Sequence, residues 1–309
     1  MSNTKVFIDG SAGTTGLRIH ERLSGREDLS LIILPDELRK DVSARREALF
    51  EADIAFLCLP DDAAREAVAL AEGSGVAIID TSTAHRTLDG WEYGFPELMG
   101  RKERIAASKR IGNPGCHASG FIALVEPLVR EGVISPDALL SCYSVTGYSG
   151  GGKKMIAEYE EDGRDSLLNS PRMYALGQQH KHLKEMTKIC GLESHPIFCP
   201  VVAPFYSGME VSVPLHASQI GAGMNKIKEI YQSYYTDGLV KYVECGDESG
   251  FLSSTALAGR DDMQLGVYGN NDRIVLVARY DNLGKGASGA AIQNMNLLIG
   301  AEQSKGLNI

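Results

Sequence analysis

The sequence predicts an α/β protein with two domains, and three observations support this fold class. The chain has 309 residues, which is long for a single hydrophobic core. Up to about residue 116, short apolar runs alternate with helical patterns, as they do in a doubly wound parallel sheet. From Leu139 onward, alternating strands and turn residues predict an α+β domain with a mixed, largely antiparallel sheet.

Composition and charge exclude several classes of protein. Charged residues make up 23% of the chain and hydrophobic residues 43%, and the net charge of −9 argues against a nucleic-acid-binding surface. No apolar run approaches the ~20 residues that cross a bilayer, and the N-terminal residues lack a signal-segment pattern. The six cysteines have no paired spacing. We therefore expect a cytoplasmic protein with free thiols, no metal site and no membrane partner.

A glycine turn follows the first expected strand, residues 5–9, and precedes a helix expected over 17–23. Glycines permit close approach of the backbone, and the N-terminus of a helix attracts phosphate. The turn therefore predicts a dinucleotide site, although a plain βα turn is the alternative. The expected contacts are Gly10, Ser11, Gly13, Thr14, Thr15 and Gly16.

Four charged residues follow the second expected strand, residues 29–34. Asp36 and Glu37 lie about 20 residues after the glycine turn, where an acid binds the ribose hydroxyls of NAD. Arg39 and Lys40 would instead suit the 2′-phosphate of NADP. A solvated loop is the third interpretation, so these residues alone leave the choice of cofactor open.

The next two strands are expected over 52–59 and 76–80, and both are apolar. In an open parallel sheet the carboxyl ends of the strands face the ligand crevice. Ser82 and Arg86 follow the strand 76–80, so we expect them to contact a ligand.

The run Gly112-Asn113-Pro114-Gly115-Cys116 precedes an apolar helical pattern. Because proline does not fit inside a helix, we expect the helix to begin near Cys116. The unpaired N–H groups and positive dipole at that end favour a thiolate. Cys116 is therefore predicted to be a nucleophile, with a buried structural cysteine as the alternative. The adjacent His117 would splay about 100° away on the helix, which argues against it as the base.

Residues 147–153 combine glycines, a hydroxyl and a lysine in one turn before a helix. Backbone N–H groups and an ammonium charge can act on the same anion, so Ser149, Gly150 and Lys153 are candidate anion contacts. A flexible hinge is the alternative.

His180 and His182 lie at the start of an expected helix that runs to about residue 190. If the helix has already begun, they project about 200° apart and do not both face one ligand. One of them is a candidate general acid/base, because imidazole titrates near neutral pH. Two surface histidines are the alternative.

The final expected helix begins in the small-residue segment 281–291 and runs to about residue 299. Its small side chains would admit another backbone or a flat cofactor ring, and we expect it to return to the first domain.

Together, the predicted dinucleotide site and the predicted nucleophile indicate one class of reaction. A thiolate attacks an activated acyl group, and a nicotinamide transfers hydride at the same carbon. A free carboxylate is too poor an electrophile, so the substrate is expected to be an acyl phosphate, or an aldehyde in the reverse direction.

These motifs resemble those of the N-acetyl-γ-glutamyl-phosphate reductases of arginine biosynthesis, in their shorter subclass. The resemblance spans nearly the whole chain and is carried by residues 10–16, 112–117, 147–153, 180–182 and 282–289. It implies a Rossmann-type dinucleotide-binding domain, residues 1–116 completed by 284–309, and a catalytic and oligomerisation domain, residues 117–283. It also implies NADP(H), which favours Arg39 and Lys40, and a homodimer or homotetramer.

The resemblance further implies that Cys116 displaces phosphate from N-acetylglutamyl 5-phosphate to form a thioester, which is reduced and released as the semialdehyde. His180, with His182 in reserve, would be the acid/base. Additional cofactor contacts would be Ser82, Asn282, Gly284, Lys285 and Gly286, and substrate contacts Arg86, Asn113, Ser149, Gly150 and Lys153. The alternatives are an aspartate-semialdehyde dehydrogenase, another acyl-phosphate reductase, or a dinucleotide-binding sensor without turnover.

Overall fold

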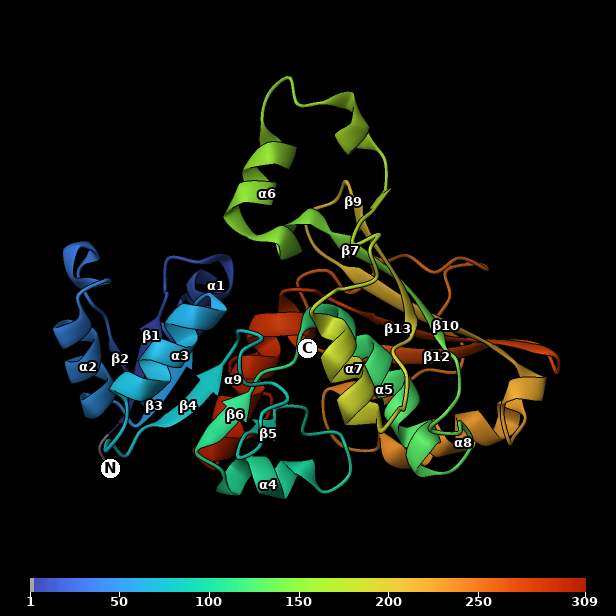
Figure 1. Cartoon of the computed structure of the whole chain (residues 1–309), viewed down its shortest axis with the longest axis horizontal. Helices are drawn as coiled ribbons and strands as arrows, with labels where there is room; N and C mark the ends of the chain where they lie inside the picture. Colours follow the sequence, from blue (N-terminus) through green and yellow to red (C-terminus); the bar gives the residue numbers. More distant parts are fainter. Residues whose placement is uncertain (1–2) are drawn as a thin grey trace. The chain divides into compact units, whose positions relative to one another are not determined.

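The structure is a computed structural model that describes residues 3–309 (Figure 1). The chain divides into two compact units. Unit 1 comprises the chain up to Pro96 together with Gly100–Pro114 and Ala287–Leu307. Unit 2 comprises Glu97–Met99, Gly115–Gly286 and Asn308–Ile309.

Unit 1 contains a parallel sheet with the strand order β2-β1-β3-β4-β6-β5. Its strands are β1 (Thr4–Asp9), β2 (Leu29–Ile32), β3 (Ile54–Leu57), β4 (Ala77–Asp80), β5 (Glu92–Tyr93) and β6 (Arg110–Gly112). Its helices are α1 (Thr14–Leu23), α2 (Val42–Glu51), α3 (Asp61–Leu70), α4 (Arg101–Ala107) and α9 (Gly289–Leu298). Every residue of β3 is buried, as expected for a parallel strand that is covered on both faces. The predicted doubly wound fold is confirmed.

Two apolar clusters cover the two faces of this sheet. Val6 and Ile8 of β1 point to one cluster and Phe7 points to the other, because successive side chains of a strand alternate in direction. Ile292 and Met295 of α9 are buried in the first cluster. The last helix of the chain is therefore part of the core of unit 1.

Unit 2 contains a mixed sheet with the strand order β11-β12-β13-β10-β7-β9-β8. Its strands are β7 (Ser141–Gly147), β8 (Arg172–Met173), β9 (Ile197–Ala203), β10 (Met209–His216), β11 (Val240–Tyr242), β12 (Met263–Gly269) and β13 (Arg273–Tyr280). Its helices are α5 (Cys116–Arg130), α6 (Gly152–Glu160), α7 (His182–Cys190) and α8 (Met224–Tyr234). Only the pairs β7·β9 and β11·β12 are parallel. The predicted mixed, largely antiparallel sheet is confirmed.

Helix α5 is the buried helix of unit 2 and packs on both α7 and the sheet (Figure 1). It passes close to the strands at Gly120, where an added Cβ would lie 2.7 Å from both the Tyr280 hydroxyl and the Val211 side chain. Only glycine permits this approach, which fixes the height of α5 above the sheet.

The parallel pair β7·β9 is joined by residues 148–196, which include α6, β8 and α7. Figure 1 shows α6 projecting beyond the ends of β7 and β9. Tyr148, Tyr159 and Leu168 form a small apolar cluster there with Val202 of β9, and Tyr174 packs against it. In the described part of the chain, no helix is long and apolar enough to cross a membrane.

Candidate active site

Cys116 is the first residue of α5, as the sequence predicts, and its side chain is half-buried. Gly115 is the N-cap and provides no side-chain hydrogen bond to the first turn. The Tyr280 hydroxyl accepts the Gly120 N–H at 3.0 Å and donates to the Cys116 carbonyl at 2.5 Å. It therefore stands between two groups that would otherwise bond to each other within the helix. Gly286 lies against the cysteine, since an added Cβ there would be 3.1 Å from Cys116 Cβ.

Three histidines lie together beside the start of α5. The rings of His180 and His182 are 4.6 Å apart, and those of His117 and His182 are 5.5 Å apart. Helix α7 begins at His182, so His180 precedes it. The two side chains would diverge only if the helix began before His180, and it does not. His180 and His182 are neighbours in one cluster that also contains His117.

Glu185 connects this cluster to the start of α5. Its carboxylate is buried and accepts the Gly115 N–H through Oε2 at 3.2 Å, while Oε1 lies 3.8 Å from Nε2 of His182. Glu185 is not among the residues predicted from the sequence. The available signal was its spacing of i,i+3 from His182, which places both residues on one face of a helix.

Tyr174 is the second residue that the sequence analysis did not identify. Its hydroxyl lies 2.8 Å from Nε2 of His117, and its ring is 5.8 Å from that of His180. Nδ1 of His117 lies 2.7 Å from the Ser144 hydroxyl. Burial, with a further contribution from His180, lowers the pKa of His117 to about 3, so the imidazole is neutral at pH 7.

Of the predicted anion contacts in residues 147–153, one is buried and another is exposed. Ser149 is buried, and its hydroxyl accepts a hydrogen bond from the Asn282 amide at 2.9 Å. Lys153 is exposed in the first turn of α6. The Asn282 oxygen accepts the Gly208 N–H at 3.0 Å, so the amide expected to contact a cofactor is bonded within unit 2.

Lys285, expected to contact the cofactor, forms a buried ion pair in the structure. Its ammonium group is fully buried and lies 2.8 Å from both oxygens of Glu97. A charge at this depth requires an opposite charge beside it, so Lys285 forms a structural ion pair within unit 2. Gly284 is also needed for packing, because an added Cβ would overlap the Arg260 carbonyl.

The glycine turn of unit 1 is shaped by its own backbone. Gly10 has φ of +86°, and an added Cβ would overlap the Cys58 carbonyl, whereas one at Gly16 would overlap the Gly10 carbonyl. Gly13 is the N-cap of α1 and provides no side-chain cap. The buried Oγ1 of Thr14 has no hydrogen-bond partner among the described residues. The turn therefore presents an uncapped helix N-terminus and an unsatisfied hydroxyl, which suit a phosphate group.

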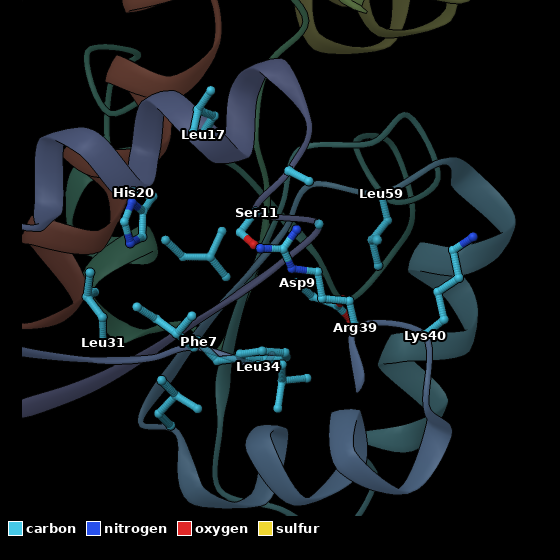
Figure 2. A pocket seen from close by; sticks show the side chains of 15 residues that line it. Phe7, Asp9, Ser11, Leu17, His20, Leu31, Leu34, Arg39, Lys40 and Leu59 are labelled. Atoms are coloured by element: carbon cyan, nitrogen blue, oxygen red, sulfur yellow. The ribbon is translucent and has the colours of Figure 1, made fainter. Parts of the chain in front are cut away.

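A cavity of about 490 Å³ adjoins this turn and is lined by Asp9, Gly10, Ser11, His20, Arg39 and Lys40 together with apolar residues of β1, α1 and the segment 31–34. Figure 2 shows the Arg39 side chain extending toward Ser11, whereas Lys40 points away. Neither Asp36 nor Glu37 lines the cavity, and Asp36 instead pairs with Arg39 at 2.7 Å. The Nε atom of Arg39 is buried without a partner in the part of the chain that is described. Of the four charged residues that follow β2, the two basic ones therefore line the cavity and the two acidic ones do not.

Three predicted ligand contacts of unit 1 are already hydrogen-bonded within it. The Ser82 hydroxyl donates to Asp80 at 2.7 Å, and the Arg86 guanidinium donates to the Thr81 carbonyl at 2.9 Å. The Asn113 amide donates to the Ala287 carbonyl at 3.0 Å, and its oxygen lies 3.1 Å from the Asn294 amide. Asn113 is 1% exposed.

Among residues 3–309, no group of three or more His, Cys, Asp or Glu side chains is placed to hold a metal ion.

Comparisons with known proteins identify the family of each part of the chain. Residues 34–107 match the family described as "Semialdehyde dehydrogenase, NAD binding domain", and residues 116–282 match "Semialdehyde dehydrogenase, dimerisation domain". A solved aspartate semialdehyde dehydrogenase II from Vibrio cholerae, complexed with ASA, has a TM-score of 0.73 at 20% identity and covers 97% of this chain and 99% of its own. An aspartate semialdehyde dehydrogenase with NADP from Candida albicans has a TM-score of 0.70 at 16% identity, with coverage of 96% and 99%. These structures show the shared fold.

Sequence relatives define the family more narrowly. The chain is 43% identical to N-acetyl-gamma-glutamyl-phosphate reductase 2 of Nostoc sp., over 99% of this chain and 100% of the relative. It is 45% identical to the N-acetyl-gamma-glutamyl-phosphate reductase of Brucella ovis, over 96% and 99%. With its two semialdehyde dehydrogenase domains, the chain belongs to the N-acetyl-gamma-glutamyl-phosphate reductase family.

Proposed function

We propose that the protein catalyses the NADPH-dependent reduction of N-acetyl-L-glutamyl 5-phosphate to N-acetyl-L-glutamate 5-semialdehyde, with release of phosphate. The observation that carries the proposal is the position of Cys116 at an uncapped helix N-terminus beside His180, His182 and Glu185. Helix N-terminal N–H groups lower the pKa of a thiol and stabilise an oxyanion, which are the two needs of acyl transfer to sulfur.

The chain's own groups account for the acyl-transfer steps. The Cys116 thiolate forms a C–S bond to the acyl carbon, and the C–O bond to phosphate breaks. The nicotinamide, when bound, supplies hydride to the same carbon. A histidine of the cluster gives a proton to the resulting alkoxide and takes it back as the C–S bond breaks, which releases the aldehyde and restores the thiolate.

We assign the proton transfer to His180. The Nδ1 atom of His180 accepts the His182 N–H at 3.2 Å, so the neutral imidazole carries its proton on Nε2. His182 is more deeply buried than His180, and its Nε2 faces Glu185. A carboxylate in this position orients the His182 ring and does not present it to a substrate. His182 therefore positions the cluster.

The residues around the unit 1 cavity fit NADP(H). The helix N-terminus at Gly13, with the unsatisfied Thr14 hydroxyl, would hold the pyrophosphate. Arg39 would pair with the 2′-phosphate, because its guanidinium reaches the cavity and a phosphate takes two parallel N–H bonds. Ser149, Gly150, Lys153 and Arg86 remain our candidates for the substrate's anionic groups.

We further propose a homodimer or homotetramer in the cytoplasm. The match of residues 116–282 to a dimerisation domain supports self-association. Tyr143 and Ile197 lie exposed on the neighbouring strands β7 and β9, and a second copy would cover them. The six free thiols suit a reducing compartment.

The decisive experiment measures phosphate-dependent oxidation of N-acetylglutamate semialdehyde and of aspartate semialdehyde, each with NADP and with NAD. We expect activity with N-acetylglutamate semialdehyde and NADP. Activity with aspartate semialdehyde alone would contradict the substrate, and activity without phosphate would contradict the acyl-phosphate mechanism. The Cys116→Ala variant is expected to lose turnover and keep NADPH binding, whereas a sensor would show no turnover in the wild type.

A further inference from the structure

A buried ion pair lies at the start of the glycine turn in unit 1. Asp9 is the last residue of β1, immediately before Gly10, and it is 3% exposed. Nε and Nη2 of Arg45, which lies in α2, both donate to Oδ2 of Asp9, at 3.1 and 2.9 Å. Arg45 is 5% exposed, so both charges of the pair are buried. The proposed function assigns no role to either side chain.

Glu66 of α3 also contacts this guanidinium. Nη1 of Arg45 donates to Oε2 of Glu66 at 2.7 Å, and the Glu66 side chain is 52% exposed. Water screens the charge of an exposed carboxylate far more than that of a buried one. The charge of Arg45 therefore acts mainly on Asp9.

Asp9 lines the cavity in which the proposed function places NADP(H), whereas Arg45 and Glu66 do not line it. Ser11 and Arg39 line the same cavity (Figure 2). The turn after Asp9 attracts phosphate through its backbone N–H groups and the N-terminus of α1. A carboxylate just before this turn opposes that attraction, because like charges repel strongly where water is excluded.

The pKa of Asp9 reflects two opposing effects. Burial raises this pKa above the ordinary value of an aspartate, and the hydrogen bonds from Arg45 are the largest effect that lowers it. Two N–H groups of one guanidinium converge on a single oxygen of the carboxylate. Arg45 is therefore the group that compensates the negative charge of Asp9.

We propose that Arg45 is a positioning residue for the cofactor, which neutralises the Asp9 carboxylate in the wall of the cavity and so permits NADPH to bind with its 2′-phosphate. The inference rests on the proposed function in placing NADP(H) at the glycine turn. Arg39 would contact the 2′-phosphate directly, whereas Arg45 acts on it only through Asp9. NADH has no 2′-phosphate, so its binding depends less on this neutralisation.

The test is the binding of NADPH and of NADH to the full-length protein at about pH 8, well above the ordinary pKa of a carboxyl group. The fluorescence of the reduced nicotinamide follows binding, and the measured quantity is the ratio of Kd for NADH to Kd for NADPH. Arg45→Met is expected to lower this ratio by about 10-fold, the effect of one uncompensated charge near a phosphate. Asp9→Asn combined with Arg45→Met removes both charges, so the ratio is expected to return to the wild-type value.

Two control variants separate the charge of Arg45 from its packing. Arg45→Lys keeps the positive charge, so the ratio is expected to stay at the wild-type value even where thermal unfolding shows lower stability. Glu66→Gln removes a carboxylate from the same guanidinium at a position outside the cavity. It is the matched control for Asp9, and we expect it to leave the ratio unchanged.

An unchanged ratio in Arg45→Met, or a lowered ratio that the double variant does not restore, would overturn the proposal in favour of a structural ion pair. Asp9→Asn alone tests it if Arg45→Met does not fold. This variant removes the opposing charge and keeps Arg45, so the ratio is expected to rise, and a fall would overturn the proposal. A wild-type protein that does not bind NADPH would instead contradict the proposed function.

Discussion

The carboxylate of Glu185 accepts the backbone N–H of Gly115 at 3.2 Å, one residue before the cysteine. Its second oxygen faces His182 of the same helix at 3.8 Å. The buried Glu185 side chain therefore links the first turn of α5 to the histidine cluster. A small shift of α5 or of α7 would change the contacts of this carboxylate.

Glu185→Gln keeps an oxygen for Gly115 and replaces the charge that faces His182. We expect kcat to fall by about 10- to 100-fold, because misplacement by about 1 Å has this effect on a catalytic group. Steady-state kinetics and thermal unfolding would measure it, with the melting temperature nearly unchanged. Glu193→Gln, which alters an exposed carboxylate just beyond α7, is the control. A wild-type kcat in Glu185→Gln would show that the link to His182 has no catalytic role.

Arg39→Ala and Lys40→Ala distinguish two adjacent cations at the unit 1 cavity. Arg39 reaches toward Ser11 and Lys40 points away, so only the arginine is expected to contact a 2′-phosphate (Figure 2). We expect Arg39→Ala to raise KM for NADPH by about 10- to 100-fold, as loss of a charged hydrogen bond does, and to leave KM for NADH unchanged. Equal effects of both variants on KM for NADPH would contradict the assignment.

Gly10→Ala and Gly13→Ala separate folding from ligand binding in the glycine turn. Gly10 has φ of +86° and no room for a Cβ, so we expect alanine there to lower the free energy of unfolding by about 2 kcal/mol or more. An added Cβ at Gly13 would meet nothing nearer than 3.4 Å, so this variant should fold normally and bind NADPH more weakly. Urea unfolding and NADPH fluorescence titration measure the two effects. Gly25→Ala, in open space, is the control for both.

His117 makes stability depend on pH in a definite direction. Its pKa is about 3 in the folded protein and about 6.5 when exposed, so between these values the unfolded chain binds a proton that the folded chain does not. Stability is therefore complete above pH 6.5 and decreases as the pH falls, by about 2 kcal/mol at pH 5. Urea unfolding at pH 7 and pH 5 measures the loss. We expect a smaller loss in His117→Gln and an unchanged one in His195→Gln, and identical losses in all three proteins would exclude His117 as the source.

The parts of the site that could be predicted from sequence are those formed by neighbouring residues. The glycine turn and the start of α5 at Cys116 follow from local spacing, and both were predicted. Glu185 meets its partner across 70 residues and Tyr174 across 57, and no local pattern records such contacts. The burial of Lys285 could not be predicted either, because its partner Glu97 lies 188 residues away in the sequence.

The relative direction of His180 and His182 could not be predicted for a related reason. A helix that began before His180 would separate the two side chains, whereas α7 begins at His182 in the structure. Ala175 and Gln178 have φ of +53° and +54°, which no continuous helix allows. The Gln178 amide donates to the Phe198 carbonyl and accepts the Phe198 N–H. These long-range hydrogen bonds hold Gln178 in a conformation outside the helix, which begins after it.

The parallel pairing of β7 with β9 carries a consequence for how the protein can change over evolution. A parallel pair requires a long crossover, and here that crossover supplies Tyr174, His180, His182 and Glu185. Its first part, around α6, projects away from the strands and can gain or lose residues without shifting their register. Its second part is fixed by specific contacts, such as those of Gln178 with Phe198 and of Glu185 with Gly115. Insertions or deletions in the lobe around α6 are therefore expected to leave His180, His182 and Glu185 in place.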